Sequence, residues 1–299
     1  MEQHDDASRT RAGLGLALGA YGLWGVFPLF WRLLAHVPGL EQALQRICWV
    51  TVVYLAVAAV AGKLGQVREA LTDRPTRRAL AASAALVAVN WFVFIYAVET
   101  ERVLHASLGY YLNPLVSVLL GLVVLGERLR PAQWVAVGLA AAGVVVMGLR
   151  ADAFPWISLV LAGAFGLYGL VRKTASAEAI AGSTVEGLLL LPFCLAGVLW
   201  LEGSGQGHFL LDGRTTLLLL LTGPVTAVPM LCFAGAARRL PLTTLGFIQY
   251  LAPTMQFLVA VFVFGEAFTA AHMVAFGLIW TGVGLFGADG YLGLRGRAA

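Results

Sequence analysis

The chain has 299 residues, of which 60% are apolar and only 12% are charged, and its mean hydropathy is +0.83. A water-soluble chain of this length needs far more polar surface, so the composition excludes a pair of soluble domains and predicts an all-α integral membrane protein. The net charge of +4 does not indicate a nucleic-acid partner, because the basic residues are spread between apolar runs.

Ten apolar runs are long enough to cross the hydrocarbon core of a membrane, which takes about 20 residues. The predicted transmembrane helices span 12–34, 41–61, 79–99, 104–125, 131–149, 155–173, 181–202, 215–236, 243–264 and 270–289. Short connections separate these runs, and the longest is 62–78. The sequence therefore predicts a polytopic bundle without a soluble domain.

Lysine and arginine are distributed unevenly between the two sides of this bundle. With the N-terminus placed in the cytoplasm, 15 of the 20 basic residues fall in or beside the cytoplasmic loops. Cytoplasmic loops of membrane proteins carry such an excess. We therefore expect both termini to be cytoplasmic.

The two halves of the chain resemble each other. A shift of 139 residues superimposes Tyr111, Pro114 and Gly126-Glu127 on Tyr250, Pro253 and Gly265-Glu266, and a shift of 144 superimposes Tyr21-Gly-Leu-Trp-Gly25 on Phe165-Gly-Leu-Tyr-Gly169. These matches predict two five-helix repeats, 12–149 and 154–289. Because five is odd, the second repeat enters the membrane from the opposite side, and inverted repeats are the usual basis of alternating access. The rival interpretation is a duplication that only builds a bundle.

Several motifs together resemble the RarD-type permeases of the EamA branch of the drug/metabolite transporter superfamily. They are Tyr21-Gly-Leu-Trp-Gly25 with Pro28, Asn90-Trp91, Ala106-Ser-Leu-Gly-Tyr110, Asn113-Pro-Leu-Val116, Gly126-Glu-Arg128, Tyr168-Gly-Leu-Val-Arg-Lys173, Glu186 with Pro192, Thr244-Leu-Gly-Phe-Ile-Gln-Tyr250 and Pro253-Thr254. The resemblance covers almost the whole chain and implies ten helices, two EamA-type repeats and an inner (plasma) membrane permease. RarD proteins are commonly labelled chloramphenicol-sensitivity or resistance permeases, a label that leaves the physiological substrate open.

Two prolines point to a substrate site near the middle of the membrane. Pro114 and Pro253 each fall about ten residues into a span, which is roughly 15 Å deep in a core of about 30 Å. Proline removes a helical hydrogen bond and kinks the helix, and carbonyls freed at this depth require protein or a wet cavity. Polar and aromatic residues near the two prolines and in other spans complete the predicted substrate site: Trp24, Asn90, Trp91, Tyr110, Tyr111, Asn113, Gln249 and Tyr250. The rival interpretation is that these prolines and amides only hold the bundle together.

A few charged residues are candidates for coupling or gating. Glu186 is the one acid placed well inside a span, where it could carry protons or could pair with Arg172 or Lys173. Arg32 and Arg46 flank the first outer loop near Glu41, where a gating salt bridge and a solvated interface are both open. Glu127 and Glu266 directly follow their helices and are predicted to be either interface anchors or contacts that close the repeats.

Transport is the predicted function: a secondary-active or facilitative permease moves a small organic solute, such as a metabolite, an amino acid or a drug like chloramphenicol, by alternating access. The alternative class is a membrane-embedded enzyme or a lipid-handling protein. The sequence contains no nucleophile elbow, HExxH motif or Walker loop, so neither an enzyme nor an ATP-driven pump is predicted. We expect no metal and no cofactor. The expected partners are a small-molecule substrate and the lipid bilayer, with a homodimer left open.

Overall fold

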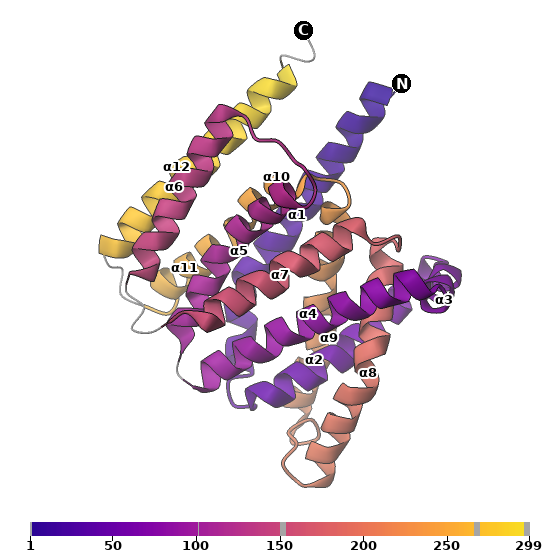
Figure 1. Cartoon of the computed structure of the whole chain (residues 1–299). Helices are drawn as coiled ribbons and strands as arrows, with labels where there is room; N and C mark the ends of the chain where they lie inside the picture. The colour runs from indigo at the N-terminus through magenta and orange to yellow at the C-terminus, as the bar shows by residue number, and fades with distance from the viewer. Residues whose placement is uncertain (1, 101, 150–153, 266–269, 296–299) are drawn as a thin grey trace.

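A computed structural model describes residues 2–100, 102–149, 154–265 and 270–295 (Figure 1). These residues form helices and connecting turns, with no strand among them. The helices are α1 Glu2–Leu33, α2 Gly39–Val60, α3 Leu64–Thr72, α4 Arg74–Glu99, α5 Val103–Val123, α6 Pro131–Gly148, α7 Trp156–Thr174, α8 Ala179–Gly203, α9 Gly213–Ala237, α10 Leu242–Gln249, α11 Leu251–Phe262 and α12 Ala270–Arg295. The described residues contain ten segments long and apolar enough to cross a membrane, the ninth of them formed by α10 and α11 together. The all-α, ten-span prediction is confirmed.

Two features differ from the predicted spans. Helix α1 begins about ten residues before the predicted start, and the long connection 62–78 contains the short helix α3. Val67 and Ala70 of α3 are buried with Ala181 and Val185 of α8. The apolar side of α3 therefore covers the beginning of α8, while most of its other residues are exposed.

The starts of two spans are marked by side chains that cap the helix. Helix α6 begins at Pro131, and the side chain of Gln133 accepts the backbone N–H of Arg130 at 3.0 Å. Helix α9 follows Asp212, whose carboxylate accepts the backbone N–H groups of Arg214 and Thr215 at 2.8 and 2.9 Å. Hydrogen bonds from Thr215 lower the pKa of Asp212, because they stabilise its charged form.

Most contacts between the two halves come in matched pairs. The contact of α4 with α7 corresponds to that of α9 with α1, and the contact of α5 with α7 corresponds to that of α11 with α1. Three further large contacts, α2 with α8, α5 with α10 and α6 with α12, join a helix to its own counterpart in the other half. The contact of α2 with α9 is an exception, because the corresponding contact of α8 with α4 is smaller. Figure 1 shows α6 and α12 side by side along one edge of the bundle. This pattern agrees with two halves related by a pseudo-two-fold axis.

Glycines make the α6–α12 contact reciprocal. A Cβ atom added at Gly143 would lie 2.8 Å from the carbonyl oxygen of Ala275, and one added at Gly282 would lie 2.7 Å from the carbonyl oxygen of Ala136. Each residue of one pair lies 139 positions from its counterpart in the other pair. The two helices therefore approach closely at two sites, and the shift of 139 residues relates one site to the other.

The repeated Gly-Glu motif follows α5 and α11. Gly126 and Gly265 both have positive φ angles, of 64° and 73°, in the left-handed region that glycine adopts without steric cost. A left-handed glycine ends each helix and turns the chain toward the next span. Glu266 lies outside the described residues.

Of the two prolines at which kinks are expected, Pro253 follows an interruption of the helix, whereas Pro114 lies within a continuous one. The ninth span is divided into α10 and α11 at Tyr250, three residues before Pro253. Helix α5 instead continues through Pro114 as one element. A Cβ atom added at Gly246 of α10 would lie 2.7 Å from the carbonyl oxygen of Pro114, so the two proline segments meet where α5 crosses α10.

Candidate functional site

Helix α1 begins and α12 ends on the same side of the molecule, which we call the terminal face; the other end of the bundle is the opposite face (Figure 1). The polar and aromatic candidates form groups at three levels. One group lies toward the opposite face, one at mid-depth and one toward the terminal face.

Arg46 of α2 lies among aromatic rings toward the opposite face. Its Cζ atom is 3.9 Å from the ring centroid of Trp91 in α4 and 5.3 Å from that of Trp31 in α1. Tyr110 of α5 interacts electrostatically with Arg46, and its ring lies 5.7 Å from that of Phe94. We call Trp31, Arg46, Trp91, Phe94 and Tyr110 the Arg46 cluster. Within the described residues the guanidinium makes no hydrogen bond or ion pair, and its Nε atom is buried.

Trp24 belongs to a second aromatic group. Its ring centroid is 5.7 Å from that of Phe165 and 5.8 Å from that of Phe233, and Phe233 also stacks on Tyr168 at 5.7 Å. Tyr21 completes this group, 5.5 Å from Trp24. The shift of 144 residues relates Tyr21 to Phe165 and Trp24 to Tyr168, so the group is built on repeat-related positions of α1 and α7.

Three amide side chains lie near mid-depth and differ in their partners. The Nδ2 atom of Asn90 donates to the carbonyl oxygen of Leu161 at 2.9 Å and so joins α4 to α7. Asn113 is 2% exposed, and its Oδ1 atom is buried without a hydrogen-bond partner in the described chain. Gln249 is also buried, at the last position of α10, and its side chain makes no hydrogen bond to the residues placed by the structure. Asn113 and Gln249 are therefore free to bind a ligand, whereas Asn90 is already occupied.

Tyr111 and Tyr250 lie together, but away from Tyr110. Both are buried in one cluster with Ala140 of α6 and Ile279 of α12. The structure therefore places this repeat-related pair against the α6–α12 edge, while Tyr110 faces Arg46.

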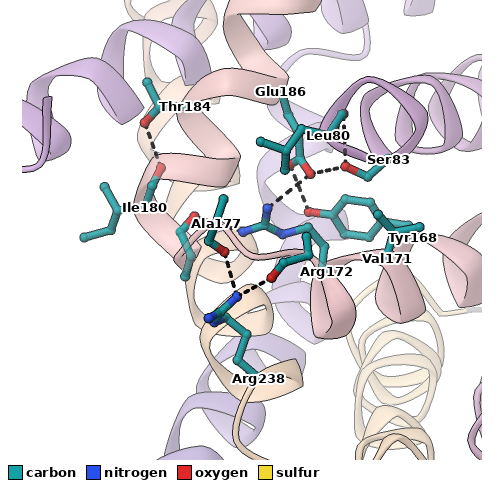
Figure 2. Close-up of polar contacts among 12 residues, drawn as sticks. Leu80, Ser83, Tyr168, Val171, Arg172, Ala177, Ile180, Thr184, Glu186 and Arg238 are labelled. Carbon is teal, nitrogen blue, oxygen red and sulfur yellow. Dashed lines mark hydrogen bonds and ion pairs between the residues drawn. The ribbon is translucent and has the colours of Figure 1, made fainter. Parts of the chain in front are cut away.

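Glu186 and Arg172 form a buried ion pair toward the terminal face (Figure 2). The Nη1 atom of Arg172 lies 3.4 Å from Oε1 of Glu186, and the two side chains are 0% and 6% exposed. Ser83 of α4 donates a hydrogen bond to Oε1, and Tyr168 donates one to Oε2 at 3.4 Å. Of the two partners left open by the sequence, the structure selects Arg172; Lys173 instead donates to main-chain carbonyls after α9.

Further contacts join the two halves at the terminal face. The carboxylate of Glu127 accepts the backbone N–H groups of Leu242 and Thr243 at 2.7 and 2.9 Å, so a residue of the first half caps α10 in the second. Lys63 pairs with Glu178, and this partner lowers the pKa of Glu178. The predicted repeat-closing role of Glu127 is confirmed.

A cavity of about 780 Å³ opens at the opposite face. Its lining includes Arg32, His36, Asp212 and Arg214, and the guanidinium of Arg32 lies 4.4 Å above the ring of Phe264. The side chains of Arg32 and Arg46 therefore lie in different surroundings.

Glu41 is occupied by a different partner. Its carboxylate accepts the backbone N–H of His208 at 2.7 Å and lies 2.8 Å from Nδ1 of the same residue. The structure thus shows no salt bridge joining Arg32, Glu41 and Arg46 in the part of the chain it describes.

The ten apolar spans of the described residues are those of a multi-pass membrane protein. Residues 11–149 match the EamA-like transporter family. Protein RarD of Salmonella typhi is 44% identical over 285 residues, which cover 95% of this chain and 97% of that protein. An uncharacterized transporter of Pseudomonas aeruginosa is 43% identical over 290 residues, covering 96% and 97% of the two chains. The chain belongs to the RarD-type branch of the EamA-like transporter family.

The fold has also been observed experimentally. A crystal structure with 22% sequence identity covers 93% of this chain and 96% of its own, with a TM-score of 0.69. At this identity the similarity concerns the fold alone.

Proposed function

We propose that this protein is a permease that moves a small organic solute, such as a metabolite, an amino acid or a drug like chloramphenicol, across the inner (plasma) membrane by alternating access. The two repeats, 12–149 and 154–289, would exchange conformations around a site between them, either coupled to a gradient or with downhill flow. The matched contacts between the halves and the reciprocal glycines of α6 and α12 support this arrangement.

The unsatisfied amide of Asn113 is the observation that carries the proposal. Asn113 lies ten residues after Val103 and ten before Val123, at the midpoint of α5 and roughly 15 Å from either end. A buried polar atom without a partner at this depth costs free energy, because no water is present in the hydrocarbon core to replace it. A solute that donates a hydrogen bond to Oδ1 would remove this cost.

The neighbouring second half offers a matching group. Gln249 ends α10 immediately before the break at Tyr250, and the α5–α10 crossing brings Gly246 against Pro114. Helix ends exposed within a membrane are common at transporter binding sites, because their main-chain groups also face the ligand. We therefore place the solute between α5 and α10, with the predicted aromatic residues as candidates for its walls.

We further propose that the terminal face is cytoplasmic, with both termini there. The excess of lysine and arginine supports this orientation. Glu186 and Arg32 remain candidates for coupling and gating, the former within the network closing the terminal face and the latter in the cavity at the opposite face. An impermeant thiol reagent tests the orientation in intact cells: a cysteine introduced at Arg295 should not react, and its ready labelling would overturn the topology.

Reconstituted protein tests the transport site. Uptake into liposomes is measured for amino acids, other metabolites and amphenicols, with and without a pH gradient. Asn113→Ala and Gln249→Ala should lower flux of the transported solute at least several-fold while the melting temperature changes little. Gln66→Ala, at an exposed position of α3, is the matched control and should transport like the wild type. Wild-type affinity and flux in both amide variants would move the site elsewhere.

A further inference from the structure

The side chain of Arg46 lies in surroundings that could bind a ligand. It lies seven residues after the start of α2, Tyr110 lies seven after the start of α5, and Trp91 lies eight before the end of α4. At 1.5 Å per residue, these three residues are about 10–12 Å below the opposite face. A charged side chain at this depth is costly and is usually paired or functional.

No acid neutralises Arg46 in the part of the chain that the structure describes. Glu41 is the one acid of α2, and its two carboxylate oxygens are already bound to His208. The other described ion pairs involve residues distant from α2 or at its far end, such as Lys63 with Glu178. Among the residues that the structure describes, the positive charge of Arg46 therefore has no counter-ion.

The aromatic rings hold the guanidinium without using its hydrogen-bond donors. Cation–π attraction places the guanidinium over the face of an aromatic ring, and Trp91 at 3.9 Å and Trp31 at 5.3 Å are both within the effective range of about 6 Å. The N–H groups lie in the plane of the guanidinium and remain available, since none of them bonds to a described residue. A planar fork of free donors matches the two oxygens of a carboxylate.

We propose that Arg46 binds the carboxylate of the transported solute and that the Arg46 cluster accommodates an aromatic or apolar body attached to it. Trp31 and Trp91 lie against the cation, Tyr110 interacts with it electrostatically, and Phe94 packs on the ring of Tyr110. The substrate class is thus an organic carboxylate, in preference to a neutral compound such as an amphenicol. This assignment rests on the proposed transport function and places one end of the solute between the opposite face and Asn113.

Binding measurements on purified protein in phosphatidylcholine nanodiscs test the assignment. The probes are benzoate, phenylacetate, indole-3-acetate and tryptophan, each paired with its neutral or less acidic amide, and binding is followed by the rise in melting temperature with concentration. At least one acid should bind about tenfold more tightly than its amide, as expected for a charge-assisted pair of hydrogen bonds. A panel in which no acid binds better than its amide overturns the assignment.

Variants separate recognition by Arg46 from general effects. Arg46→Gln should weaken the acid about tenfold and leave its amide nearly unchanged, whereas Arg46→Lys should fall between, because it keeps the charge and loses the fork. Arg214→Gln, in the cavity at the opposite face, is the matched control and should bind like the wild type. Without ligand, Arg46→Gln should melt close to the wild type, since no charged partner is left unpaired and only the contacts with the tryptophan rings are lost. A strong fall in melting temperature would make Arg46 a structural residue instead.

Two further arms distinguish the remaining explanations. If added phosphatidylglycerol abolishes the effect of the acids, a lipid phosphate occupies the site and the assignment to a solute is wrong. Flux is measured separately in liposomes: binding through Arg46 without flux would refute transport but keep the site. Flux of a neutral solute that Arg46→Gln leaves unchanged, with no flux of any acid, would keep transport and refute the carboxylate.

Discussion

Replacing Glu186 by glutamine removes one charge from a pair that is almost completely buried. Glutamine has nearly the shape of glutamate and keeps one carbonyl oxygen, which can still accept from Ser83, while its amide nitrogen takes the place of the oxygen that accepts from Tyr168. The guanidinium of Arg172, which is fully buried, would lose its counter-ion. It would keep one hydrogen bond, from Nη2 to the carbonyl oxygen of Ala179 at 3.0 Å.

The loss of stability can be estimated because the variant removes only one charge of the pair. Removing one partner of a buried ion pair costs about 3–5 kcal/mol, because the other charge stays buried and uncompensated. The retained hydrogen bonds place Glu186→Gln near the lower end of that range. For chains of 150–250 residues 1 kcal/mol shifts the melting temperature by about 2–4 °C, so about 3 kcal/mol corresponds to roughly 6–12 °C.

The assay is thermal unfolding of the purified protein in one detergent, for Glu186→Gln, Arg172→Met and the double variant. The double variant should recover much of the loss, since no charge then remains buried. Glu178→Gln is the control for an exposed pair, which contributes only about 0–1 kcal/mol. Wild-type melting of Glu186→Gln, or a double variant as unstable as the two single losses added together, would refute this reasoning. Unchanged pH-driven flux in a well-folded Glu186→Gln protein would also remove Glu186 from proton coupling.

Gly143→Val should destabilise the α6–α12 contact by about 1–3 kcal/mol through overpacking. Its control, Gly138→Val on the open side of α6, should have the melting temperature of the wild type. Equal melting temperatures of the two variants would contradict the close approach of the helices. In the same unfolding assay, Glu127→Ala should lower the stability by about 0.5–2 kcal/mol, because it removes the cap of α10, and Glu127→Gln should lower it less. A Glu127→Ala protein with unchanged stability would show that the cap contributes nothing. Because Lys63 lowers the pKa of Glu178, the stabilisation is present above the unfolded pKa of about 4.3 and disappears as the pH falls through the lower folded value. The difference in melting temperature between wild type and Lys63→Gln should therefore shrink as the pH falls below the unfolded value, and a difference that does not change on acidification would refute this origin.

The spans could be predicted from the sequence because bilayer thickness fixes their length and hydropathy marks them. Helix α3 could not, since its nine residues carry few apolar positions, and the burial of Val67 and Ala70 depends on α8. The interruption at Tyr250 agrees with the kink expected from Pro253, but α5 continues through Pro114, so a proline does not by itself interrupt a helix in this chain.

The position of each candidate residue around its helix, more than its residue type, decides which group it joins. Tyr110 and Tyr111 are adjacent, so they point about 100° apart, one toward Arg46 and the other toward α6 and α12. The same spacing distinguishes Arg172 from Lys173: Tyr168 lies four residues before Arg172 on one face of α7, and both reach Glu186. A phase argument could have found this pair.

Two members of the aromatic group around Trp24 were not predicted from the sequence. Tyr168 and Phe233 were not proposed as wall residues, although the repeat already related Tyr168 to Trp24. The environment of Arg46 depends on rings from other helices, and no spacing in the sequence reveals it.

The α6–α12 contact has the form of an isologous interface, in which the same surface of two subunits meets itself. Between separate identical subunits, every substitution in such an interface occurs twice and must suit its own copy. Within one chain the two sides of such a contact can differ: position 140 is alanine, whereas its counterpart 139 residues on, position 279, is isoleucine. A contact of this form can therefore be asymmetric in its side chains, while Gly143 and Gly282 keep the backbones close at both sites.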